Sequence, residues 1–117
     1  MRVQKTYFML MAQDMDRALA FYEGALGLRR AFASPEWSEL LSGGAVVALH
    51  GGGDGRPTRT GLGFEVDDLE EACAAVLAQG GTVVRAPEDR PGEPIRLAEV
   101  RDTEGNGFSL TQLVGQG

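Results

Sequence analysis

The sequence has little of what several kinds of protein require. It holds one cysteine, Cys73, so no disulfide can form within the chain and no cysteine cluster can bind a metal. No apolar run is long enough to span a bilayer. Acidic residues outnumber basic ones by 17 to 11, and the net charge of −6 argues against nucleic acid as the main partner. Residues 1–10 lack the segments of a secretory signal, so we expect a reduced cytoplasmic protein.

The stretch from Gln13 to Leu28 has the pattern of an amphipathic helix with both ends marked. Asp14 is a good N-cap, because its carboxylate accepts hydrogen bonds from the free N–H groups of the first turn. Gly27 supplies the left-handed residue that ends a helix. Apolar residues recur between them at helical spacing and form one stripe: Met15, Ala18, Leu19, Phe21, Tyr22, Ala25 and Leu26.

Runs of β-forming residues surround this helix and occur again in the second half of the chain. Turn residues separate the runs from one another. Strands are expected at 5–12, 29–34, 37–42 and 45–50, and then at 61–66, 82–86, 95–102 and 108–114. The segment PEDRPGEP, residues 87–94, holds three prolines and is expected to be a loop.

The two halves coincide without gaps through the helix when Asp14 is placed on Asp68. Gly27 then falls on Gly81, so both halves show a strand, a capped helix and a glycine in the same order. A repeat of this length indicates two copies of one βαβββ unit rather than a solenoid of many repeats.

This repeat predicts an α+β fold in a single domain, residues 1–117. Module one covers about 5–50, a glycine-rich connector 51–60, and module two about 61–114. Each module alone is too small to bury its helix stripe well. We therefore expect the modules to join edge to edge into one curved, eight-stranded mixed sheet, with the helices on the convex face and the concave face open for a ligand.

Three stretches resemble the vicinal oxygen chelate superfamily: DMDRALAFYEGALGL, GFEVDDLEEA and DTEGNGFSL. This superfamily includes glyoxalase I, extradiol dioxygenases, fosfomycin-resistance thiol transferases and bleomycin-resistance proteins. The resemblance covers roughly residues 5–114 and implies the fold rather than one activity, since the fold serves many chemistries. It also implies a homodimer whose ligand clefts are built from both modules.

The resemblance further implies four positions for metal ligands, which are His, Glu or Gln in the enzymes of the superfamily. Here the first-strand positions of the two modules are Tyr7 and Gly61, and the last-strand positions are Ala48 and Ser109. Glycine and alanine side chains cannot bind a metal, and a lone serine is a weak ligand. We therefore expect no metal and no cofactor, and the character of the metal-free bleomycin-resistance proteins.

Without a metal, the concave face must act through shape, stacking and a few polar groups. Strand alternation points Tyr7 and Met9 inward, and Trp37 offers a stacking surface near the cleft mouth. Gly61 and Gly63 also point inward, where they either leave room for a flat ligand or only relieve crowding between the modules. Glu99 and Arg101 share one face of their strand, as polar anchors for a ligand or as part of a surface ion pair. The ligand-binding candidates are Tyr7, Met9, Trp37, His50, Gly61, Gly63, Glu65, Glu99, Arg101 and Ser109.

The leading hypothesis is a metal-free homodimer that binds a small organic molecule, such as an antibiotic or another natural product. One alternative is a metal-independent lyase, isomerase or cyclase in which Tyr7, His50 or Glu65 serves as acid or base. A metal-dependent lyase or dioxygenase requires Glu99, His50 or Glu65 to converge. A domain that binds only a protein partner is the remaining alternative.

Overall fold

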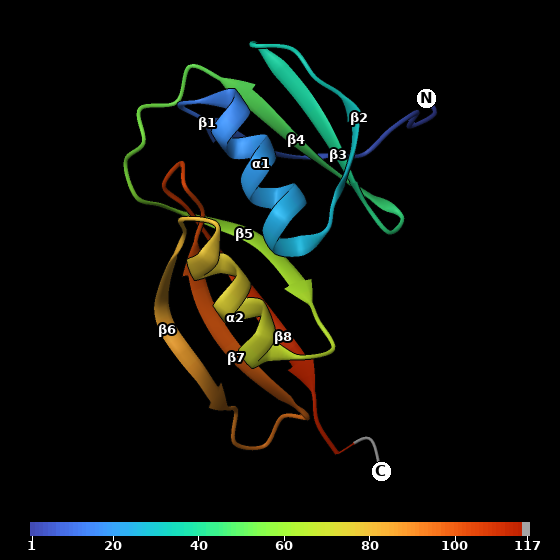
Figure 1. The fold of residues 1–117 in the computed structure, drawn as a ribbon. Helices are drawn as coiled ribbons and strands as arrows, with labels where there is room; N and C mark the ends of the chain where they lie inside the picture. Colours follow the sequence, from blue (N-terminus) through green and yellow to red (C-terminus); the bar gives the residue numbers. More distant parts are fainter. Residues whose placement is uncertain (116–117) are drawn as a thin grey trace.

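The computed structural model describes residues 1–115 of the chain. The first module holds one helix and four strands (Figure 1). Its elements are β1 (Phe8–Ala12), α1 (Met15–Leu26), β2 (Arg29–Phe32), β3 (Trp37–Ser42) and β4 (Ala45–Gly51). The second module repeats this order with β5 (Thr58–Glu65), α2 (Leu69–Ala78), β6 (Thr82–Asp89), β7 (Ile95–Arg101) and β8 (Asn106–Leu113).

The strands form two four-stranded sheets with the same internal order, β1-β4-β3-β2 and β5-β8-β7-β6. β1 pairs in parallel with β4, and β5 pairs in parallel with β8. All other neighbouring strands are antiparallel. The α+β fold of two βαβββ modules is therefore confirmed. Its eight strands are divided between two hydrogen-bonded sheets rather than joined into one.

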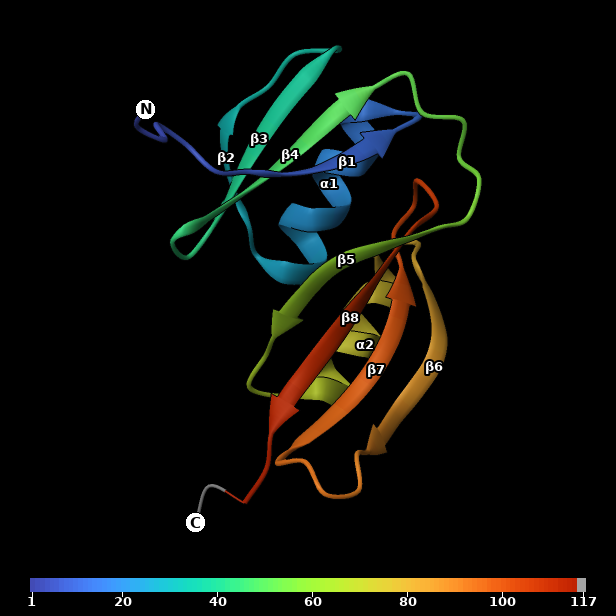
Figure 2. The same cartoon turned by 180° about the vertical axis from the view of Figure 1, so that it is seen from behind.

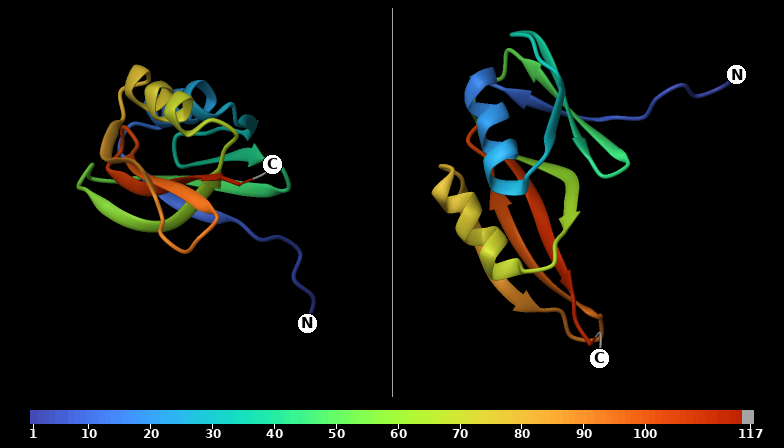
Figure 3. Two further views of the ribbon diagram at one scale, coloured as in Figure 1. Left: turned by 90° about the horizontal axis from the view of Figure 1, so that it is seen from below. Right: turned by 45° about the vertical axis from the view of Figure 1, so that its right-hand side comes forward.

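Both helices lie on the same side of the two sheets. Viewed from below, α1 and α2 run beside each other in one layer and the strands form the other layer (Figure 3). The opposite side of the molecule shows the strands in front of the helices (Figure 2). Each sheet thus has one face packed under a helix and one face that no helix covers. No helix within residues 1–115 is long and apolar enough to cross a membrane.

The two helices begin at the predicted aspartate caps. The side chain of Asp14 accepts a hydrogen bond from the Arg17 N–H, and that of Asp68 accepts one from the Glu71 N–H. Gly27 ends α1 in the left-handed conformation, with φ of 67°. At the end of α2 the positive φ belongs to Gly80 instead of Gly81, the residue on which the repeat places Gly27.

One hydrophobic core joins the two modules. The aromatic rings of Phe21 and Tyr22 on α1 pack against Phe108 of β8, with centroid distances of 6.3 and 5.9 Å. Phe64 of β5 meets the same ring edge-on at 5.5 Å. The first helix therefore stabilises the second sheet as well as its own, and neither module has a complete core of its own.

A buried polar network reinforces this junction. The Tyr22 hydroxyl donates to Asp102 Oδ2 over 2.6 Å, and the Asn106 amide donates to the Met11 carbonyl over 2.8 Å. Glu104 accepts from the backbone N–H groups of Gln13 and Asp14 just before α1, over 2.9 and 2.7 Å. The turn DTEGN thus ties the second module to the start of the first helix.

The predicted loop at 87–94 is wrong in its first part, because β6 continues through Pro87 to Asp89. β6 lies at the edge of its sheet and has one neighbouring strand, so the missing N–H of Pro87 affects at most one hydrogen-bond ladder. The register also shifts between Arg85 and Glu88, which places Pro87 at an irregularity of the pairing.

Candidate ligand-binding site

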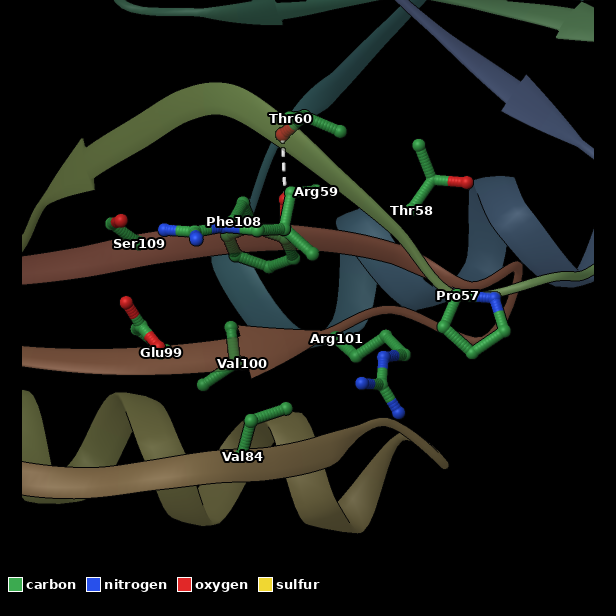
Figure 4. A pocket seen from close by; sticks show the side chains of 11 residues that line it. Pro57, Thr58, Arg59, Thr60, Val84, Glu99, Val100, Arg101, Phe108 and Ser109 are labelled. Carbon is green, nitrogen blue, oxygen red and sulfur yellow. Dashed lines mark hydrogen bonds between the residues drawn. The ribbon is translucent and has the colours of Figure 1, made fainter.

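The uncovered face of the second sheet holds a cavity of about 300 Å³. It lies across β5, β6, β7 and β8 (Figure 4). Its lining mixes charged, hydroxyl and apolar side chains and consists of Pro57, Thr58, Arg59, Thr60, Val84, Glu99, Val100, Arg101, Gly107, Phe108 and Ser109. Such a mixed lining suits a small organic molecule that carries polar groups.

Strand pairing places two arginines on either side of a glycine in this cavity. Gly107 of β8 is the partner of Arg59 on one side and of Arg101 on the other. The next pair of residues on the same face is Ser109 with Glu99. Figure 4 shows the Arg59 side chain extending toward Ser109, whereas the guanidinium of Arg101 lies toward Pro57.

A bulge in β5 shapes this part of the sheet. Arg59 pairs with Gly107, and Gly63 pairs with Ser109. Between these two pairs β5 therefore advances by four residues while β8 advances by two. The Thr60 hydroxyl donates to the Gly107 carbonyl over 2.6 Å and accepts from the Leu62 N–H over 3.2 Å. The bulge therefore lifts the intervening segment out of the ladder, as is common beside binding sites.

The charges in the cavity have no ion-pair partner within the described part of the chain. Six arginines elsewhere contact a carboxylate: Arg17, Arg30, Arg56, Arg85, Arg90 and Arg96. Among residues 1–115, no carboxylate lies within 4.0 Å of Arg59 or Arg101, and no basic group lies within that distance of Glu99. The proposed ion pair of Glu99 with Arg101 is therefore not formed.

The uncovered face of the first sheet carries an aromatic cluster. Trp37 meets the ring of Tyr7 edge-on at a centroid distance of 5.4 Å and that of His50 at 6.1 Å. The Trp37 indole N–H donates to Glu39 over 2.8 Å, and Lys5 forms an ion pair with the same carboxylate. These contacts hold the pKa of Glu39 below its usual value, the Lys5 hydrogen bond being the main cause.

Comparison with known proteins settles the family. The model of the Glyoxalase/Bleomycin resistance protein/Dioxygenase superfamily matches residues 6–110. The chain belongs to this superfamily. Lactoylglutathione lyase of Haemophilus influenzae is 31% identical to the chain in an alignment that covers 88% of the chain and 87% of the lyase. The CFP32 protein of Mycobacterium bovis is 33% identical over 113 residues, but the chain spans only 43% of its length.

Solved structures of the superfamily share the fold at lower sequence identity. The fosfomycin resistance protein FosX of Listeria monocytogenes has a TM-score of 0.79 at 15% identity, covering 99% of this chain and 98% of that one. A superfamily enzyme of Burkholderia phytofirmans has a TM-score of 0.78 at 20% identity, with coverage of 92% and 97%. These similarities establish the architecture.

The residues at the metal positions that the resemblance implies do not fit a metal site. Ala48 is fully buried and Gly61 has no side chain, so these two positions offer no ligand atom. Tyr7 directly precedes β1 of the first sheet, whereas Ser109 lies in β8 of the second. No group of three His, Cys, Asp or Glu side chains within residues 1–115 is placed to hold a metal ion.

The structure divides the predicted ligand-binding residues between the two uncovered faces. Met9, Trp37 and His50 belong to the first sheet, and Tyr7, directly before β1, packs on Trp37. The second sheet carries Gly61, Gly63, Glu65, Glu99, Arg101 and Ser109. Only Glu99, Arg101 and Ser109 of these line the cavity. Sequence reasoning missed Arg59 and Val84, because their place in the cavity depends on the β5 bulge and on the path of the edge strand β6.

Proposed function

We propose that the protein binds a small organic molecule, without a metal, in the cavity on the uncovered face of the second sheet. The observation that carries this proposal is the cavity itself, which combines Arg59, Arg101 and Glu99 with apolar surface from Val84. A volume of about 300 Å³ is at the lower end of the range for small-molecule sites.

Nuclear magnetic resonance with a library of small organic fragments tests the proposal directly. A fragment that binds is expected to shift the backbone amide signals of Glu99, Arg101 and Ser109. The same shifts are expected after the protein has been treated with a chelator that removes divalent metals. Val84→Trp places a large ring at the edge of the cavity and should abolish these shifts. Leu77→Trp is the matched control, because Leu77 is 57% exposed on α2, outside the cavity lining.

Two results would contradict the proposal. Fragments that shift only signals on the helix side of the molecule would place the ligand elsewhere. Binding that disappears with the chelator and returns with a divalent metal would show that a metal is required.

A lyase is the second candidate, and the similarity to lactoylglutathione lyase favours it. The proposed binding function is better supported, because the implied metal positions hold Tyr7, Ala48, Gly61 and Ser109. An assay for lactoylglutathione lyase activity, with and without added divalent metal, separates the two. Turnover that depends on the metal would favour the lyase.

We also propose that the protein forms a homodimer in which a second copy covers the aromatic face of the first sheet. Tyr7 and Met9 on that face are 50% and 45% exposed, and Phe32 at the sheet edge is 55% exposed. Large apolar side chains gathered on one face are typical of an interaction surface. The outer end of the segment before β1 extends away from the two sheets, where it can reach a partner (Figure 3).

A further inference from the structure

We propose that the ligand of the second-sheet cavity is a small organic acid, whose oxyanion binds over Gly107 between Arg59 and Arg101. This inference rests on the proposed function and adds the chemical class of the ligand. The shared feature of such ligands is a carboxylate or phosphoryl group, which accepts hydrogen bonds from guanidinium groups.

The geometry of the sheet creates the space for the oxyanion. Arg59, Gly107 and Arg101 occupy one row across β5, β8 and β7. Neighbouring strands lie about 4.8 Å apart, so the two arginine backbones are roughly 10 Å apart with no side chain between them. A Cβ on Gly107 would lie 3.3 Å from the Thr58 carbonyl oxygen, so the oxyanion must lie farther out from the sheet than a Cβ would. Each guanidinium must rotate about its own side-chain bonds to reach it from the direction that Figure 4 shows.

Four of the ten arginines have no carboxylate within 4.0 Å among residues 1–115, and two of these four, Arg59 and Arg101, line the cavity. The chain has 17 acidic and 11 basic residues, so carboxylates are abundant. The side chains of Arg59 and Arg101 are thus available to an anion from outside the chain.

The second row of the cavity indicates what else the ligand carries. Glu99 and Ser109 lie opposite each other there, and a carboxylate acts only as an acceptor when ionised. A donor on the ligand, such as a hydroxyl or amino group, would satisfy Glu99 at some distance from the oxyanion. Val84 supplies an apolar edge for the body of the ligand. The cavity thus fits an acid with a hydrogen-bond donor and a short apolar part.

Titration calorimetry with two matched probes tests the inference. The acid 3-phenyllactate has a carboxylate, a hydroxyl and an apolar ring, and 3-phenyllactamide differs only by its neutral amide. The acid is expected to bind at least about tenfold more tightly at low salt, since a hydrogen bond to a charged group contributes about 1.5–3 kcal/mol. Arg59→Gln and Arg101→Gln should each reduce this preference severalfold.

Two further variants make the test specific. Glu99→Gln removes the negative charge of the cavity and should strengthen binding of the acid severalfold. Arg29→Gln removes an exposed arginine from β2 of the other sheet and should leave the preference unchanged. Inorganic phosphate should compete with the acid more strongly than chloride at equal ionic strength if phosphoryl groups also bind.

The outcomes separate this inference from the proposed function. If acid and amide bind equally well, the cavity remains a small-molecule site but the inference is wrong. An acid preference that survives both arginine substitutions also overturns it. If neither probe binds at millimolar concentration, both the inference and the choice of this cavity as the ligand site fail.

Discussion

Tyr22 and Asp102 form the most buried polar contact between the two modules. Tyr22 is fully buried, Asp102 is 4% exposed, and their oxygen atoms are 2.6 Å apart. Asp102 also accepts from the backbone N–H groups of Glu104 and Asn106. Burial, together with the charge of Asp102, raises the pKa of Tyr22 well above 10.0, so the phenol stays a donor. This contact therefore contributes to the folding of the whole chain rather than to ligand chemistry.

Tyr22→Phe is expected to lower the free energy of unfolding by about 1.5–3 kcal/mol, because it removes a buried hydrogen bond to a charged group. Urea denaturation measures the change. Tyr7→Phe is the matched control, since Tyr7 is 50% exposed and its loss of a hydroxyl should cost less than about 0.5 kcal/mol. Equal effects of the two substitutions would contradict the assigned role of Tyr22.

Glu104 gives the fold a specific sensitivity to acid. Burial acts to raise the pKa of Glu104, but hydrogen bonds from Arg17, Thr103 and the Asp14 N–H outweigh it and hold the pKa below 4.5. A carboxyl group with a lowered pKa in the folded state stabilises the protein fully above its unfolded pKa. This stability is lost as the pH falls from about 4.5 through the lower folded-state value.

We therefore expect Glu104→Gln to be less stable than the natural protein near pH 7 and to lose less stability on acidification to pH 3. Thermal unfolding followed by circular dichroism across this pH range measures both effects. Glu36→Gln removes an exposed carboxylate and should behave like the natural protein. Parallel pH curves for Glu104→Gln and the natural protein would show that Glu104 is not the sensitive group.

At the scale of elements, the two glycines that follow the helices have different roles. Position 27 favours glycine because its backbone is left-handed, with φ of 67°, although a Cβ there would meet nothing within 4 Å. Gly81 has an ordinary φ, but a Cβ would lie 2.6 Å from the Arg101 carbonyl oxygen and 2.7 Å from the ring of Phe21. The second glycine therefore allows the strand β6 to pass close to the core.

Gly81→Ala is expected to destabilise the protein by about 1–3 kcal/mol, because the methyl group overpacks the core against a rigid carbonyl. Gly27→Ala should cost about 1–2 kcal/mol from backbone strain alone. Gly44→Ala is the control, since a Cβ there has open space and φ is not positive. Urea denaturation ranks the three variants, and a neutral Gly81→Ala would disprove the close approach.

The elements that the sequence predicts well are those fixed by local signals. The caps Asp14 and Gly27 define α1 within the chain itself, so its position follows from the residues nearby. By contrast, β5 begins at Thr58, three residues before the predicted strand, because its first residues pair with Asn106 and Gly107 far along the chain. Pairing between distant segments is invisible to local propensity.

The candidate site follows the same rule. Alternation along one strand correctly puts Glu99 and Arg101 on a common face, and both line the cavity. Arg59 lies in a stretch that reads as a flexible connector, so nothing local marks it. Its position opposite Gly107 arises from the bulge in β5 and from the parallel pairing with β8. Of the two arginines in the cavity, the sequence could therefore place Arg101 but not Arg59.

At the scale of the whole molecule, the helices join the modules while the two uncovered faces remain separate. The aromatic cluster and the arginine cavity lie on different sheets, with no backbone pairing between them. A single copy therefore does not bring all the predicted ligand-binding residues together. A second copy over the first sheet would cover the exposed apolar side chains there.

The expected dimer is the prediction that tests this arrangement. Light scattering coupled to size-exclusion chromatography should give twice the 12.5 kDa chain mass at micromolar concentration. Met9→Glu places a charge in the middle of the aromatic face and should yield a monomer, because burying an unpaired charge costs several kcal/mol. Leu77→Glu introduces the same charge on the exposed side of α2 and should remain dimeric. If the natural protein is a monomer, or if only Leu77→Glu dissociates, the interface does not lie on the first sheet, and each cavity must bind its ligand within one chain.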